Sequence, residues 1–185
     1  MTLALLLGPW CFSATERFGV GVDGKPISDL GGPGIRVVVL IFAASDCPIS
    51  NRYVPEVARL HREFTSQGVH FWWVFPNPQD TTSIVARHDR AFAISESVVL
   101  DTQQTLVRKA HATITPESAV FVIRDGSMRE VYHGRIDDRY LAFGRERPAP
   151  QHHELEVAIA AALAGKPVTP SAGPPVGCVI VPRQS

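Results

Sequence analysis

The stretch that decides the fold is residues 35–51, Ile-Arg-Val-Val-Val-Leu-Ile-Phe-Ala-Ala-Ser-Asp-Cys-Pro-Ile-Ser-Asn. Apart from Arg36, its first ten residues form an apolar, β-branched run without polar alternation, which is typical of a strand covered on both faces. Cys47 and Pro48 follow that run directly. The stretch therefore predicts a central strand that leads into a cysteine at the start of a helix.

A helical pattern follows the cysteine. Apolar side chains recur at steps of four, three and four residues, along one stripe formed by Tyr53, Val57, Leu60 and Phe64. This pattern predicts a helix over residues 50–67 that ends before Gly68. Pro55 is expected to kink this helix or to confine its start.

The rest of the chain predicts alternating strands and helices, ending in a hairpin and a helix. Strands are expected at 69–75, 98–100, 119–123 and 128–132, helices at 81–91, 103–110 and 154–163, and a small hairpin around Asp23-Gly24 within 20–30. The order βαβαβ(α)ββα predicts an α/β fold in which helices flank a mixed central sheet, with the small hairpin as an N-terminal extension.

Composition predicts one domain with two flanking segments. The chain has 185 residues, of which 45% are apolar and 19% are charged. We expect residues 1–17 to be a leader or signal remnant, 18–165 to be the domain, and 166–185 to be an extended tail rich in proline and glycine. Lys plus Arg and Asp plus Glu both number 18, so no basic field predicts nucleic acid as a partner.

The beginning of the chain favours export. Residues 1–12 are almost all apolar and are followed by Ser13 and Ala14, as in a signal for secretion, although the first positive charge is Arg17. A clipped signal, a misassigned start and a strand packed on the domain remain open. A periplasmic or extracytoplasmic location is favoured over a cytoplasmic one. No apolar run reaches the roughly 18 residues that cross a bilayer, so no transmembrane span is expected in the mature domain.

The chain has three cysteines, Cys11, Cys47 and Cys178, so at least one thiol stays free or pairs with another molecule. No two of them have the Cys-x-x-Cys spacing of a zinc or iron–sulfur site, so a structural metal is not expected. Cys11 is assigned to the leader.

Cys47 is the residue expected to carry chemistry, and its reactivity depends on its pKa. An ordinary thiol with a pKa of about 8.5 is only about 3% ionised at pH 7, and a pKa near 6.5 needs about 2.7 kcal/mol of stabilisation. A helix dipole contributes about 0.3–1 kcal/mol, or up to about 2 kcal/mol when sheltered. Hydrogen bonds from helix N–H groups and from Ser50 are therefore required as well, while Asp46 opposes ionisation.

These motifs resemble those of a known family. Val38–Ser50 followed by Pro55-Glu56-Val57 looks like the active-site strand, loop and kinked helix of the thioredoxin-like redoxins. Farther along, Thr115-Pro116-Glu117, the run Val120–Ile123 and the turn Asp125-Gly126 are similar to that family's cis-proline loop and hairpin. The resemblance spans about residues 20–163 and implies a thioredoxin-like fold.

The resemblance also implies an activity. It implies thiol–disulfide exchange in which Cys47 is the attacking thiol, and it places Thr115, Pro116 and Pro48 at the bound substrate. The implied partners are a disulfide or thiol, on a protein or a small molecule, and an external electron donor. No bound cofactor is implied.

The chain departs from the family pattern at Ser50, which stands where the second active-site thiol is usual. A Cys-Pro-Ile-Ser site can attack a disulfide but needs another thiol to resolve the mixed intermediate. Cys178 is the internal candidate, either as a resolving thiol or as half of a permanent bridge to Cys47. In the chain-entropy model such a bridge is worth roughly 5 kcal/mol at most.

A thiol peroxidase of the peroxiredoxin type is the nearest alternative activity. The peroxiredoxin motif carries Thr or Ser three residues before its cysteine, where this chain has Ala44. Ser45 is the only substitute for that hydroxyl, from a different angle.

A non-catalytic binding module or copper chaperone is the alternative from another class. A copper site of this kind needs two nearby thiols and a histidine. Only Cys47, Cys178 and the distant His133 could supply them, so no metal ligand is predicted. The adjacent His152 and His153 point in different directions and are assigned to the surface or to a helix cap.

The charged run at residues 134–140 favours a solvated loop with weak ion pairs. The alternative interpretation makes it one wall of a substrate groove, in which Arg135 or Arg139 receives an acidic partner.

Overall fold

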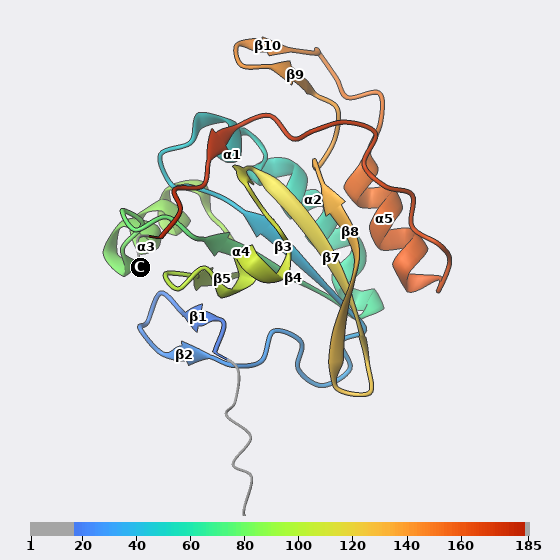
Figure 1. Ribbon diagram of the computed structural model, residues 1–185, viewed down its shortest axis with the longest axis horizontal. Coiled ribbons are helices and arrows are strands. Elements are labelled where there is room, and N and C mark those ends of the chain that lie inside the picture. The colour runs from blue at the N-terminus through green and yellow to red at the C-terminus, as the bar shows by residue number, and fades with distance from the viewer. Residues whose placement is uncertain (1–16, 184–185) are drawn as a thin grey trace, which may run out of the picture.

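The computed structural model describes residues 17–183 and shows a mixed sheet between two layers (Figure 1). The expected leader up to residue 16, including Cys11, lies outside the described residues. The strands are β1 (Gly19–Val20), β2 (Pro26–Ile27), β3 (Val37–Phe42), β4 (Val69–Phe75), β5 (Ser97–Leu100), β6 (Ile114–Thr115), β7 (Glu117–Arg124), β8 (Ser127–Gly134), β9 (Tyr140–Ala142), β10 (Arg145–Glu146) and β11 (Cys178–Val179).

The main sheet has seven strands in the order β2-β1-β5-β4-β3-β7-β8. Strand β3 pairs with β4 in parallel and with β7 in antiparallel, and all six of its residues are buried. The prediction of a central strand covered on both faces is confirmed. Strands β9 and β10 pair with each other, as do β6 and β11, outside the main sheet.

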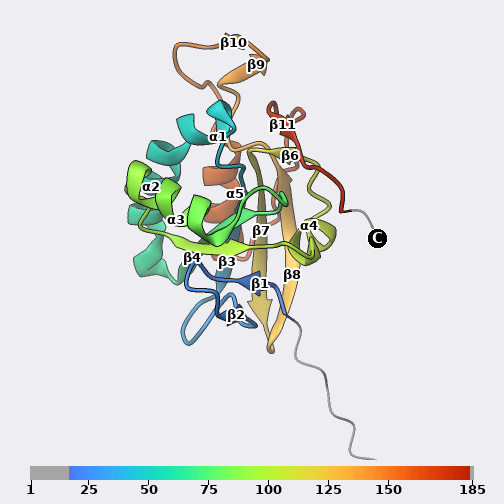
Figure 2. The ribbon, with the colours of Figure 1, turned by 90° about the vertical axis from the view of Figure 1, so that its left-hand side faces the viewer.

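Helices cover both faces of this sheet. They are α1 (Pro48–Arg52), α2 (Val54–Phe64), α3 (Thr82–Phe92), α4 (Thr105–Lys109) and α5 (Glu154–Leu163), and a 3-10 turn at Thr65–Gln67 follows α2. Residues of α1, α2, α3 and α5 pack in one apolar cluster against one face. Residues of α4 pack with the N-terminal segment and Ile180 against the other (Figure 2). None of the described helices is both long enough and apolar enough to cross a membrane.

The helix expected over residues 50–67 is divided. Tyr53 separates α1 from α2, and Pro55 occupies the first turn of α2, so this proline confines the start of the second helix. The first helix begins at Pro48, two residues earlier than predicted.

The segment after β8 corrects the interpretation of the charged run as a solvated loop. Ile136, Asp137 and Asp138 are each no more than 3% exposed, so the prediction of a solvated loop is wrong. The Tyr53 hydroxyl donates to Asp137 Oδ1 at 2.5 Å, and Asp138 accepts two backbone N–H groups.

Arg135 does not await an acidic partner, because it already pairs with Glu154 of α5. The hairpin of β9 and β10, which no sequence signal predicted, follows this segment and projects beyond α1 in both views (Figures 1 and 2).

The tail after α5 lies against the domain. It runs back over the molecule, and β11 pairs antiparallel with β6, with Cys178 opposite Thr115 and Val179 opposite Ile114 (Figure 2). Ile180 is only 5% exposed. The tail thereby carries Cys178 to the end of β3 where Cys47 lies.

Candidate functional site

Cys47 lies between β3 and α1, where the sequence predicted it. It has extended backbone geometry (φ −81°, ψ 111°) at the N-cap of α1, and Pro48 is the first helical residue. The Cys47 side chain is 1% exposed, whereas Pro48 faces solvent. Because α1 has only five residues, individual N–H groups rather than a long helix dipole act on the sulfur.

A buried polar network holds the loop before Cys47. Asp80, 1% exposed, accepts hydrogen bonds from the Ser45 backbone N–H at 3.2 Å and from the Ser45 hydroxyl. Asn51 donates to the Ser45 carbonyl at 3.2 Å, and His88 Nε2 lies 2.7 Å from Asn51 Oδ1. Burial raises the pKa of Asp80, against the hydrogen bonds from Ser45. The sequence analysis missed Asp80 and His88, which carry no local motif.

The loop before β7 lies directly beside the sulfur. The Thr115–Pro116 peptide bond is cis, both residues are buried, and the Cys47 thiol donates to the Thr115 carbonyl at 3.3 Å. Glu117 fixes this loop by accepting the N–H groups of Thr113 and Ile114 at 2.8 and 3.2 Å. His133 Nε2 lies 2.6 Å from the other oxygen of Glu117, and this bond raises the pKa of His133.

Cys178 completes a pair of thiols. Its Sγ lies 2.7 Å from the Sγ of Cys47, and both cysteines are free thiols. The Thr115 hydroxyl donates to the Cys178 carbonyl at 3.3 Å, and the Ile180 N–H donates to the Thr113 carbonyl at 2.9 Å. The structure thus brings together Cys47, Ser50, Thr115, Pro116 and Cys178, with Pro48 at the rim.

The pKa values of the two thiols are shifted in opposite directions. Burial raises the pKa of Cys47, but hydrogen bonds from Cys178, from the Ser50 N–H and hydroxyl and from the Ile49 N–H outweigh it, so this pKa lies below its ordinary value. Burial, together with the bond to Cys47, raises the pKa of Cys178 to about 12. Cys47 is therefore the more acidic thiol of the pair, and Cys178 is the less acidic one.

Ser50 is expected to set part of the Cys47 pKa. Its hydroxyl is buried, and among the described residues the Cys47 sulfur is the group on which it acts, lowering the pKa of Cys47. We expect Ser50→Ala to move the pH midpoint of Cys47 alkylation by iodoacetamide upward, because a donor that stabilises the thiolate is lost.

The measurement follows the alkylation rate against pH in reduced Cys11→Ser protein, with the modified cysteine located by mass. Ser127→Ala, which removes a hydroxyl bound only to the Arg124 carbonyl, serves as the matched control. Coincident midpoints in the Ser50 variant and the control would contradict the role of Ser50.

Two side-chain amides clamp the end of the tail. Gln104 Nε2 donates to the Val181 carbonyl at 2.6 Å, and Gln104 Oε1 accepts the Arg183 N–H at 3.0 Å. Asn77 Oδ1 accepts the Val181 N–H at 3.1 Å. Asn77 and Gln104 are 3% and 7% exposed. This amide clamp was not predicted, because its residues lie far from the tail in sequence and follow no periodic pattern.

A shallow cavity of about 360 Å³ lies beside Pro48, the residue that follows the cysteine. Pro48, Ile49 and Arg52 of α1 form one wall, and the opposite wall comes from the β9–β10 hairpin, where Phe143 is 64% exposed. A molecule that approaches Pro48 therefore meets an apolar side chain on the hairpin.

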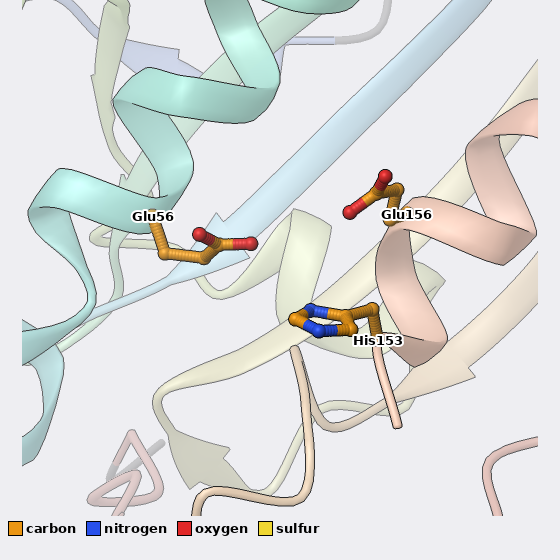
Figure 3. A group of neighbouring side chains, drawn as sticks. All are labelled: Glu56, His153 and Glu156. Atoms are coloured by element: carbon orange, nitrogen blue, oxygen red, sulfur yellow. The ribbon is translucent and has the colours of Figure 1, made fainter. Parts of the chain in front are cut away.

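One group of side chains has the composition of a metal site. Glu56 of α2 faces Glu156 of α5, with His153 beside them (Figure 3). Arg59 pairs with both glutamates, so a side-chain cation already serves as their partner. His153 is exposed at the N-cap of α5 and makes no side-chain cap bond, so of its two expected roles only the surface one fits.

The alternatives to disulfide exchange gain little from the geometry. Ala44 offers no hydroxyl three residues before Cys47, and the Ser45 hydroxyl is bound to Asp80. Within residues 17–183, no histidine or carboxylate joins Cys47 and Cys178 as a third metal ligand. His133 is paired with Glu117 instead.

A family model confirms the assignment from sequence. Residues 14–131, more than half of the chain, match the model described as the AhpC/TSA family. The chain belongs to the AhpC/TSA family. A redoxin-type thiol–disulfide function follows at the level of this family. No curated protein matches the chain.

Solved structures share the fold of this AhpC/TSA protein. An uncharacterized conserved protein from Geobacillus kaustophilus superposes with a TM-score of 0.76 at 23% identity, over 92% of this chain and 91% of that one. A secreted disulfide oxidoreductase of Mycobacterium tuberculosis gives 0.52 at 12%, over 82% and 96%.

A thioredoxin-like protein from Aeropyrum pernix gives a TM-score of 0.52 at 19% identity, over 65% of this chain and 80% of that one. The thioredoxin-like fold implied by the sequence resemblance is confirmed.

Proposed function

We propose that this protein is a thiol–disulfide oxidoreductase in which Cys47 attacks and Cys178 resolves. The observation that carries the proposal is the 2.7 Å separation of the two sulfurs at the junction of β3 and α1. The lowered pKa of Cys47 and the raised pKa of Cys178 support this division of roles, since the ionised sulfur is the nucleophile.

The reaction starts with the reduced pair. The Cys47 thiolate attacks one sulfur of a target disulfide, forms a mixed disulfide, and expels the other target sulfur, which takes up a proton. The Cys178 thiol then loses its proton and attacks Cys47 Sγ. The first target sulfur leaves as a thiol, and a Cys47–Cys178 disulfide remains, which an external thiol donor reduces.

The neighbouring groups have supporting roles in this proposal. Ser50 and the N–H groups of α1 hold the Cys47 thiolate, and the buried loop of Thr115 and Pro116 presents backbone to the target. Pro48 and the cavity beside it receive the part of the target that faces solvent. Cys178 then acts as a resolving thiol rather than as half of a permanent bridge.

The expected export and the expected division of the chain into a domain and a tail are part of the same proposal. The apolar residues 1–12 support export, and the structural neighbour from Mycobacterium tuberculosis is itself described as secreted. We propose 18–165 as the redox domain and 166–185 as a tail whose task is to deliver Cys178.

The test is to oxidise dilute, reduced Cys11→Ser protein with diamide. We expect both thiols to disappear, the mass to fall by two hydrogen atoms, and a proteolytic digest to link the peptide of Cys47 to that of Cys178. Dithiothreitol should reverse all three changes. Persistence of two free thiols, or addition of a separate adduct at each cysteine, would contradict the proposal.

A further inference from the structure

The tail of this chain is bound as a peptide ligand is bound. Strand β11 pairs antiparallel with β6, and a backbone hydrogen bond joins Ile180 to Thr113, as described above. The amide clamp, Asn77 and Gln104, reads only backbone atoms of residues 181 and 183. The recognition therefore depends on an extended backbone more than on the side chains at those positions.

Glycine is required just before the bound cysteine. A Cβ on Gly177 would lie 2.0 Å from the Thr115 carbonyl oxygen and 2.6 Å from its carbon. Both atoms are backbone, in a loop fixed by Glu117, so they cannot move aside as a flexible side chain can. Any other L-residue is excluded from this position when the cysteine points at Cys47.

A second selective position lies two residues after the cysteine. Ile180 is 5% exposed and packs in the cluster that includes Phe42 and Leu106, whereas Val179 between them is 68% exposed. Successive residues of an extended strand face opposite sides. The site therefore contacts the side chain at position 180 and leaves the side chain at position 179 in solvent.

We propose that the edge of β6, the apolar cluster that buries Ile180 and the amide clamp form the target-binding site of the enzyme, with the tail as its resident occupant. The site selects an extended segment in which glycine directly precedes the reacting cysteine and a β-branched aliphatic residue follows two positions later. This inference rests on the proposed function, because it names the substrate class of the same thiol pair.

The exchange step is balanced. The tail leaves, and a target segment places its disulfide-bonded cysteine where Cys178 was. Cys47 Sγ attacks that sulfur, and the electrons of the broken bond go to the departing thiolate. The tail then returns, and Cys178 Sγ attacks Cys47 Sγ. The Cys47–Cys178 disulfide forms, the bond between Cys47 and the target breaks, and the target leaves as a thiol.

The test uses full-length protein with Cys11→Ser and Cys178→Ser, so that the first step is trapped. The probes are the peptide Val-Gly-Cys-Val-Ile-Val-Pro-Arg, which copies residues 176–183, and its counterpart with alanine in place of glycine. Each cysteine carries a thionitrobenzoate disulfide, whose coloured release gives the rate. We expect the glycine peptide to react at least about tenfold faster, because the alanine methyl meets the Thr115 backbone.

A third probe is glutathione with the same leaving group. Because it lacks the extended segment that the proposed site binds, it reports the intrinsic reactivity of Cys47. In Gln104→Ala, the rate of the glycine peptide relative to glutathione should fall several-fold, whereas the exposed neighbour Gln103→Ala should leave it unchanged. Comparing the two peptides needs only one protein, so it does not depend on how any clamp variant folds.

Equal rates for the glycine and alanine peptides would overturn the inference, and reaction with glutathione would then leave the proposed function standing. Failure of all three probes to react would contradict the proposed function itself, and this inference with it.

Discussion

Replacing Cys178 with serine is expected to produce an enzyme that reacts once and then stops. The Cys47 thiolate keeps its Ser50 and backbone donors, so it still attacks a disulfide. The mixed disulfide then persists, because the sulfur that lay 2.7 Å away is gone. A well-oriented neighbouring group reaches effective concentrations of ~10⁵ M or more, so turnover should fall by at least ~100-fold.

Steady-state reduction of a peptide disulfide with a dissolved thiol as donor measures this loss. A burst of one equivalent per chain, with the target bound covalently to Cys47 by mass, identifies the stalled step. Cys11→Ser alone is the control and should turn over as the parent does. Undiminished turnover in the Cys178 variant would show that an outside thiol resolves the intermediate.

Gly177→Ala is expected to separate the two thiols without touching either of them. The new methyl group would lie 2.0 Å from the Thr115 carbonyl oxygen, so the tail has to shift away from β6. Overpacking of this kind costs about 1–3 kcal/mol. The equilibrium between the dithiol and the Cys47–Cys178 disulfide, measured against glutathione, should therefore move toward the dithiol by about fivefold to 150-fold.

The same variant should also alkylate faster at Cys47, which the tail otherwise covers. Gly173→Ala is the matched control in the same tail, because its methyl would meet only the far end of the flexible Arg135 side chain, at 2.9 Å. Thermal unfolding of both variants reports on the rest of the fold. If Gly177→Ala and Gly173→Ala shift the glutathione equilibrium equally, the close approach to Thr115 does not position Cys178.

The sequence could predict the elements whose signal is local. The unbroken apolar run of residues 37–42 indicated a strand buried on both faces, and β3 is that strand. The helix predicted over residues 154–163 is α5, with the same bounds. Cys47 was correctly placed at the start of a helix, because the strand, the cysteine and the proline follow one another directly in the sequence.

The parts that could not be predicted depend on contacts between distant segments. Asp137 and Asp138 look solvated in sequence, yet they are buried because Tyr53 and the backbone before α5 satisfy their oxygens. The amide clamp is similar, since Asn77 and Gln104 bind backbone atoms more than seventy residues away. Hydrogen bonds to backbone leave no pattern of residue types, so only the folded chain reveals them.

The pairing of β11 with β6 also bears on how the molecule behaves when concentrated. Release of the tail in the proposed cycle would leave the Ile114 and Thr115 edge without its partner, next to the apolar surface that otherwise buries Ile180. An identical tail from a second molecule fits this place as well as the original one does. We therefore expect concentrated, partly oxidised preparations to form domain-swapped oligomers that are linked by disulfides between chains.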